Sequence, residues 1–290
     1  MPTTMLPVLT ISAAEKTAGQ LSEQRLAFAA DVMATHGVLK IEGAVADLAA
    51  VDALRERMLQ DMAQFEAEGG VLSHNWQGLR PPPCHPFLHE ELVFNRFAVA
   101  IAQHLVGDSV DGGLALGIIN SNTAYAVGAP NHPPISQEVH TDSNEPYDLS
   151  ATSGFDGPMS SVYVNVVLSR MTADTGATEC WLGTHNDPGL RHGKGFGDPF
   201  FEGGRRSTSW PTPAMITAWE AKNGPSIHTV AEPGDVLLRD ARVWHRGTAN
   251  RGGEHRPMIR MSYSGERRNL CCVLKFSHAC PEPVLANCRV

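Results

Sequence analysis

The sequence predicts a mainly β protein, a sandwich or barrel whose strands follow a helical N-terminal part. Helical periodicity is confined to residues 1–112, whereas from residue 113 the chain breaks into short β-prone runs. The loops between these runs are rich in Gly, Pro, Asn and Asp, as in antiparallel sandwiches and barrels. Because a chain of 290 residues with 42% hydrophobic content can bury a sizeable core, we expect one domain over residues 1–290.

The helical part is predicted to open with an α-β-α order. Apolar residues recur at helical spacing within 26–33, 48–65 and 92–106, which predicts three helices. Gly37 is a suitable end for the first helix, and the largely apolar run Val38–Ile41 predicts a strand directly after it.

The β part has six candidate strands and one long interruption. Residues 186–225 show little periodicity, so we interpret them as a loop-rich insertion in a β core that covers 113–276. Residues 277–290 then form a tail. The candidate strands are 114–119, 161–168, 177–181, 236–239, 257–263 and 271–276.

Composition disfavours several function classes. The formal net charge is -8 and the Lys and Arg residues are dispersed, so no footprint of nucleic-acid binding is visible. The sequence lacks a signal-peptide pattern and a run of about 20 apolar residues, so we expect a cytoplasmic protein without a membrane span. Six cysteines without a CxxC pair indicate reduced thiols, with a zinc site or disulfide in the C-terminal tail as the alternative. We expect a small-molecule partner and allow for a homodimer.

The first chemical signal is Gln137-Glu-Val-His140-Thr-Asp142. In an extended segment, alternation puts His140 and Asp142 on one side with Cα atoms roughly 6.6 Å apart, close enough to bind one metal ion. Taken alone, the pair is better explained as a solvated or hydrogen-bonded loop pair.

A second signal follows the turn Gly234-Asp235 and the apolar run 236–238. His245 stands between Trp244 and Arg246-Gly247, at what would be a strand end near the mouth of a barrel. An imidazole at this place suits a metal ligand, and the alternative is a structural histidine.

Arg256 lies eleven residues beyond His245, at the start of a predicted strand in which Arg256, Met258, Arg260 and Ser262 share one face. A buried arginine that faces a barrel interior needs an anion, because its unpaired charge is costly and its fork fits a carboxylate. The C5 carboxylate of 2-oxoglutarate would serve. A surface position is the alternative for Arg256 and for Arg260.

Two histidines and one carboxylate form a facial triad that leaves three positions open on Fe(II). In this order, followed by Arg256, the chain resembles the phytanoyl-CoA dioxygenase family, and within it the small oxygenases that tailor natural products. The stretch Thr175-Gly-Ala-Thr-Glu-Cys-Trp-Leu-Gly-Thr-His185 is similar to that family's Asn-Gly-Ala-Thr…Pro-Gly-Ser-His, and residues 244–250 are similar to its distal-histidine signature.

The resemblance implies a double-stranded β-helix, a jelly-roll or cupin-like core, with helices packed on one sheet. It implies that His140, Asp142 and His245 hold Fe(II), and that 2-oxoglutarate and O₂ are the cosubstrates. It further implies roles in 2-oxoglutarate binding for Arg256, Gln137, Thr178 and Asn120. Leu182 and Thr184 depart from the family's Pro and Ser in the matched turn, whereas an aspartate at position 142 argues against a halogenase.

The expected reaction is oxidation of a small molecule, by hydroxylation, desaturation or a related outcome, with release of succinate and CO₂. Two alternatives stay open: a cupin-like metal enzyme that needs no 2-oxoglutarate, and a non-catalytic small-molecule-binding module on the same fold. Candidate substrate-selecting residues, chosen by position, are His74, Trp76, Arg80, Asn144, Tyr147 and the segment Phe196–Trp210.

Overall fold

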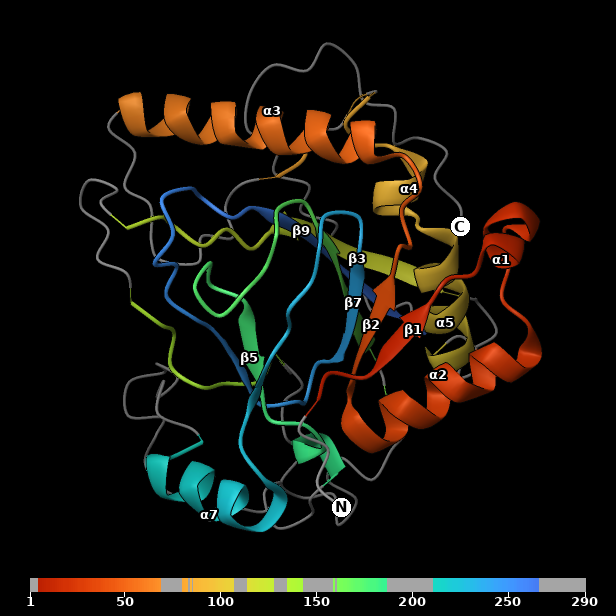
Figure 1. Ribbon diagram of the computed structural model, residues 1–290, viewed down its shortest axis with the longest axis vertical. Coiled ribbons are helices and arrows are strands. Elements are labelled where there is room, and N and C mark those ends of the chain that lie inside the picture. Colours follow the sequence, from red (N-terminus) through yellow and green to blue (C-terminus); the bar gives the residue numbers. More distant parts are fainter. Residues whose placement is uncertain are drawn as a thin grey trace.

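Two β-sheets face each other in a computed structural model of the chain (Figure 1). The structure describes residues 5–68, 80–82, 84, 86–106, 114–127, 135–142, 159, 161–186 and 211–265. The larger sheet has the order β1-β2-β7-β4-β9-β3, made by Val8–Thr10, Val38–Glu42, Val236–Asp240, Ser161–Val167, Met258–Ser264 and Ala115–Ser121. The smaller sheet has the order β6-β5-β8, made by Ile227–His228, Thr178–Cys180 and His245–Gly247. The predicted double-stranded β-helix is confirmed.

Helices cover one face of the larger sheet. Helices α2 and α5 pack on each other, α2 contacts β2, and α5 contacts β4 and β9. Figure 1 shows α3 across one end of the molecule and α7 at the other. None of the helices in the described residues is long and apolar enough to cross a membrane. The helices are α1 (Ala13–Ala18), α2 (Glu23–His36), α3 (Leu48–Ala67), α4 (Glu90–Val93), α5 (Arg96–Val106) and α7 (Pro213–Asn223), with a 3-10 turn η2 at Thr184–Asn186.

Strict alternation along the central strands separates the core from the site. On β4, Val162, Val164 and Val166 join the main hydrophobic cluster under the helices. Because neighbouring residues of a strand point to opposite faces, Tyr163 and Asn165 turn toward the other sheet. The same alternation on β7 and β9 buries Val236, Leu238, Ile259 and Met261 on the helix side and turns Arg239 and Arg260 inward.

Most of the predicted elements are present, and the differences have local causes. The helix expected over 92–106 is interrupted before α5 because Asn95 caps it: the Asn95 amide oxygen accepts from the Ala98 N–H at 3.2 Å. The insertion expected to be loop-rich over 186–225 contains α7, which begins with a Thr212 cap and a proline in its first turn. The predicted strand 271–276 and the tail 277–290 lie outside the described residues.

Leu238 tests how much the central strand contributes to stability. Its side chain is fully buried on β7, between Leu39 of β2 and Val164 of β4. We expect Leu238→Ala to lower the free energy of unfolding by about 2 to 5 kcal/mol, because the sheet cannot close the cavity left behind. Urea denaturation measures this loss. The exposed Val230→Ala control should change stability by less than about 0.5 kcal/mol, and equal losses would refute the assignment.

Candidate active site

Backbone pairing brings the two predicted ligand segments together. His140 and His245 exchange both backbone hydrogen bonds, each at 2.9 Å, as an isolated antiparallel bridge. On either side, the Gln137 N–H donates to the Gly247 carbonyl at 2.8 Å and the Asp142 N–H donates to the Ala241 carbonyl at 2.9 Å. This register holds residues about one hundred positions apart in the sequence at fixed separation.

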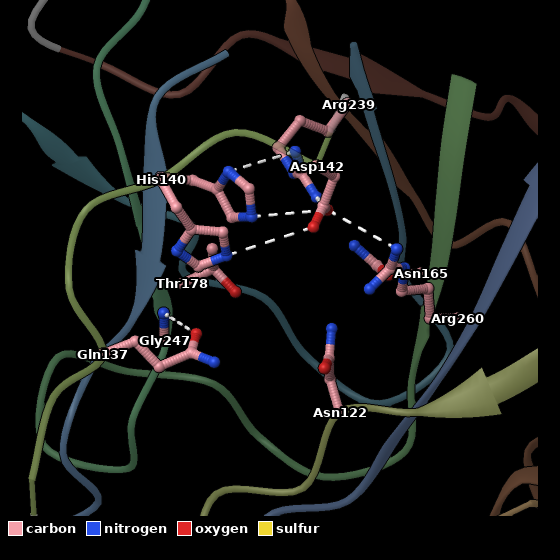
Figure 2. Close-up of a pocket in the computed structure, with 10 residues that line it drawn as sticks. Asn122, Gln137, His140, Asp142, Asn165, Thr178, Arg239, Gly247 and Arg260 are labelled. Carbon is pink, nitrogen blue, oxygen red and sulfur yellow. Dashed lines mark hydrogen bonds and ion pairs between the residues drawn. The ribbon is translucent and has the colours of Figure 1, made fainter. Parts of the chain in front are cut away.

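The side chains of His140, Asp142 and His245 converge from this pair of segments (Figure 2). Their potential ligand atoms all lie within 4.8 Å of one another. The His140 Nε2 is 4.0 Å from one oxygen of Asp142, and the His245 Nε2 is 3.4 Å from the other. Two imidazoles and one carboxylate in this arrangement suit Fe(II) and leave coordination positions open.

The other ring nitrogens orient the two imidazoles. His140 Nδ1 lies 2.8 Å from the Glu138 carbonyl, and His245 Nδ1 lies 3.0 Å from the Val243 carbonyl. When each Nδ1 carries the proton and donates it to its carbonyl, Nε2 keeps its lone pair for a metal ion. At His140 the backbone therefore favours the tautomer that a ligand requires. At His245 the Arg239 guanidinium, a donor, also lies 3.2 Å from Nδ1 and competes with the Val243 carbonyl for that nitrogen.

Two inward-facing arginines set the electrostatics. The Arg239 guanidinium donates to Asp142 Oδ2 in a short ion pair, and Arg260 lies 3.6 Å from the same oxygen. Burial alone would raise the pKa of Asp142, but the charge of Arg239, and then that of Arg260, hold that pKa well below its usual range. Burial, and then the charge of Arg239, lower the pKa of His245 to about 3. Both groups are therefore in their metal-binding protonation states at neutral pH.

A pocket opens beside the three ligand side chains. Of the residues implicated by the family resemblance, Gln137 and Thr178 line it, whereas Arg256 and Asn120 do not. The Gln137 side-chain oxygen accepts from the Gly247 N–H at 2.8 Å. The lining residues are Asn122, Gln137, His140, Asp142, Asn165, Thr178, Arg239, His245, Gly247 and Arg260.

Arg256 lies next to the pocket wall and is 2% exposed. Its two terminal nitrogens donate to the backbone carbonyls of Asn122, at 3.0 Å, and Gly176, at 2.6 Å. Its Nε, although buried, has no hydrogen-bond partner among the described residues. Burial lowers the pKa of Arg256 to about 10. Asn120 is also buried, and it stands opposite Arg260 where β3 pairs with β9.

The sequence reasoning missed Arg239, Asn122 and Asn165. Arg239 carried a usable signal, because it is the one charged residue inside the run Val236–Arg239 and alternation turns it away from Leu238. Arg80 is described but does not line the pocket. The other candidate substrate-selecting residues, His74, Trp76, Asn144, Tyr147 and the segment Phe196–Trp210, lie outside the described residues.

The depressed pKa of His245 predicts acid sensitivity of the metal-free protein. As pH falls through about 6.5, His245 of the unfolded chain takes up a proton, whereas the folded chain does not until about pH 3. The unfolding free energy should therefore fall with decreasing pH, by up to about 1.4 kcal/mol per unit from this group. Asp142 acts in the same direction only in more acidic solution.

Urea unfolding of the metal-free protein between about pH 7.5 and about pH 5 measures this slope. His245→Asn removes this proton uptake by the unfolded chain. The dependence of its unfolding free energy on pH should therefore be shallower, by up to about 1.4 kcal/mol per pH unit, since the other histidines contribute equally to both proteins. Parallel slopes would show that His245 titrates normally in the folded state.

Comparison with known proteins places this site in a family. The sequence profile of the phytanoyl-CoA dioxygenase (PhyH) family matches residues 33–258. The fold is similar to that of AviO1 from Streptomyces viridochromogenes Tue57, with a TM-score of 0.53, 16% identity and coverage of 84% of this chain and 96% of that one. It is also similar to EvdMO1, with a TM-score of 0.53 and 15% identity over 82% of this chain; the chain spans 50% of that protein.

A third similar structure is the epimerase SnoN from nogalamycin biosynthesis, solved in complex with Fe3+, alpha ketoglutarate and nogalamycin RO. Its TM-score is 0.56 at 16% identity, and 84% of each chain is covered. These likenesses show a shared fold, while the profile match extends over most of the chain and includes His140, Asp142 and His245. The chain therefore belongs to the phytanoyl-CoA dioxygenase family of iron- and 2-oxoglutarate-dependent oxygenases.

Proposed function

We propose that the protein is a dioxygenase that oxidises a C–H bond of a small molecule, by hydroxylation, desaturation or a related outcome, and releases succinate and CO₂. One observation carries the proposal: His140, Asp142 and His245 converge at one side of a polar, buried pocket. Family membership disfavours the two alternatives, a metal enzyme independent of 2-oxoglutarate and a non-catalytic binding module.

When bound, iron and 2-oxoglutarate supply the oxidation, in which O₂ is consumed, 2-oxoglutarate becomes succinate and CO₂, and the substrate is oxidised by two electrons. The chain's own residues position the reactants. The three ligand side chains hold the metal from the side of the paired segments 137–142 and 241–247, and this leaves the pocket side open. Arg239 occupies Asp142 Oδ2 and so restrains the carboxylate.

The far side of the pocket suits the distal carboxylate of 2-oxoglutarate. Gln137 and Asn122 lie across the pocket from Asp142 (Figure 2). The buried Asn122 side-chain oxygen and the Arg256 Nε have no hydrogen-bond partner among the described residues. Buried polar groups left unpaired are costly, and a ligand that pairs with them removes that cost. We therefore assign Arg256, with Gln137 and Thr178, to this carboxylate, with Asn120 as a more distant contributor behind Arg260.

The substrate class proposed is a secondary metabolite. SnoN is an alpha ketoglutarate dependent epimerase from nogalamycin biosynthesis, and SnoK from the same biosynthesis is an alpha ketoglutarate dependent carbocyclase. Both have the fold of this chain at 16% and 17% identity. That likeness supports a tailoring role, while the individual oxidative outcome depends on how a substrate is oriented at the metal.

Asp142 provides the direct test of the metal assignment. Anaerobic addition of Fe(II) and 2-oxoglutarate to the wild-type protein should produce a weak visible charge-transfer band. Asp142→Ala should lose this band and lower succinate formation by more than about a hundredfold. Loss of a residue that only hydrogen-bonds to a metal ligand typically costs less than this. The exposed Asp174→Ala is the control and should keep both. Full turnover in Asp142→Ala would refute the assignment of Asp142 as a metal ligand. Absence of the band in folded wild-type protein would contradict the assignment of 2-oxoglutarate as the cosubstrate.

Arg256 tests the position of the cosubstrate. Arg256→Gln should raise the KM for 2-oxoglutarate by at least about tenfold, because a charge-assisted hydrogen bond to a carboxylate is lost. Arg256→Lys keeps the positive charge but lacks the planar guanidinium group. Its KM for 2-oxoglutarate should therefore lie between those of the wild-type protein and Arg256→Gln. Initial rates of succinate formation measure the effect, with the exposed Arg251→Gln as control. An unchanged KM would move the anchor elsewhere, with Arg260 as the first candidate.

A further inference from the structure

A row of three polar side chains crosses the inner face of the larger sheet. Arg260 of β9 is directly paired with Asn120 of β3 on one side and with Asn165 of β4 on the other. Residues paired in this way carry their side chains on the same face of a sheet. All three are buried, with 9% or less of each residue exposed, and Figure 2 shows Arg260 and Asn165 together at one side of the pocket.

Each of the three side chains has a buried polar atom whose hydrogen-bonding capacity is unused. The Arg260 Nε and the side-chain oxygens of Asn120 and Asn165 have no hydrogen-bond partner among the described residues. The Arg260 guanidinium packs over the Tyr163 ring at 4.0 Å, which fixes its plane. Unpaired donors and acceptors that are buried side by side are costly, and a polar ligand would pair with them.

The charge balance of the pocket indicates the sign of that ligand. The charged side chains that line it are Arg239, Arg260 and Asp142, so two arginines share one carboxylate. Asp142 does not fully neutralise Arg260, because it is shared with Arg239. Its Oδ2 lies 3.6 Å from Arg260 and also accepts a hydrogen bond from Arg239. Iron(II) and the 2-oxoglutarate dianion cancel each other, so this imbalance remains. A buried charge of this kind is costly without a counter-ion.

The position of Arg260 argues against 2-oxoglutarate as that counter-ion. Arg260 lies beside a metal ligand, whereas the distal carboxylate of 2-oxoglutarate is separated from its chelating end by a carbon chain that spans about 5 Å when extended. That chain fits better toward Gln137 and Asn122, where Arg256 lies next to the wall. The other carboxylate of 2-oxoglutarate belongs to its chelating end, so the metal ion would pair with its charge. Arg260 is then left for a second anionic molecule close to the metal.

We propose that Arg260, with Asn165 beside it, binds a carboxylate of the primary substrate, so that the enzyme oxidises a carboxylic acid. The planar guanidinium fork matches a carboxylate, and the Asn165 amide, which also lines the pocket, can donate a further hydrogen bond to it. The acid would be held by its carboxylate beside the metal, which limits oxidation to carbons near that group. This inference rests on the proposed function, because it takes the pocket to be the substrate site of a 2-oxoglutarate dioxygenase.

The test uses the full-length protein loaded with Mn(II) and 2-oxoglutarate, since manganese replaces iron without turnover in air. Acetate and benzoate, each with its matched amide, acetamide and benzamide, are titrated by calorimetry. We expect at least one carboxylate to bind at least about tenfold more tightly than its amide. Arg260→Gln should abolish this preference while it changes the affinity for 2-oxoglutarate by less than about threefold. Arg170→Gln, whose side chain is 70% exposed, is the matched control and should keep the preference.

Three results would overturn the proposal. They are equal binding of acids and amides, no acid binding that depends on Arg260, and a loss of 2-oxoglutarate affinity in Arg260→Gln as large as that in Arg256→Gln. Arg260→Lys keeps the charge and guards against a folding defect, and it should retain part of the acid preference. If 2-oxoglutarate itself shows no Mn(II)-dependent binding to the wild-type protein, the proposed function fails. The same titrations with Mn(II) alone then still decide whether Arg260 binds the acids.

Discussion

The pairing of segment 137–142 with segment 241–247 is the constraint on which the site depends. A single bridge, in which His140 and His245 exchange two backbone hydrogen bonds, fixes the relative position of two ligands that are far apart in the sequence. Sheet pairing extends this control, since β8 pairs with β5 and sets His245 opposite Cys180 and Gly247 opposite Thr178. The metal-binding atoms and one pocket residue are thus located by main-chain hydrogen bonds, which side-chain substitutions nearby leave in place.

Buried charge is the second determinant, because the inner face of the larger sheet carries arginines where a barrel of this size could hold apolar side chains. The Arg239 guanidinium stabilises the ionised form of Asp142, and that ion pair offsets part of the desolvation of both groups. The same charge disfavours protonation of His245. One arginine therefore keeps two metal ligands in the state in which they bind a cation, although as a cation itself it repels the metal.

The sequence predicted which side chains converge at the candidate metal site, but not the contacts around the candidate cosubstrate residues, for a physical reason. His140, Asp142 and His245 are the residue types that the chemistry demands, and helical or strand periodicity identified α2, α3, β4, β7 and β9. By contrast, β1, β6 and β8 have three residues or fewer, too short for alternation to be visible. Alternation also correctly placed Arg256 and Arg260 on one face, but it could not show that Arg256 bonds to the carbonyls of Asn122 and Gly176. Those partners are remote in sequence and carry no side-chain signature.

The three buried arginines differ in what already pairs with them, and this difference divides the pocket by function. Arg239 pairs with the carboxylate of Asp142, and Arg256 donates to two backbone carbonyls. Arg260 packs over the Tyr163 ring and lies 3.6 Å from Asp142 Oδ2. Carbonyl dipoles orient a guanidinium without cancelling its charge, so Arg256 remains able to attract an anion, and Arg260 even more so. Two anion-seeking groups at separate places match a reaction that brings two organic molecules to one metal. A pocket built for 2-oxoglutarate alone would need only one of them.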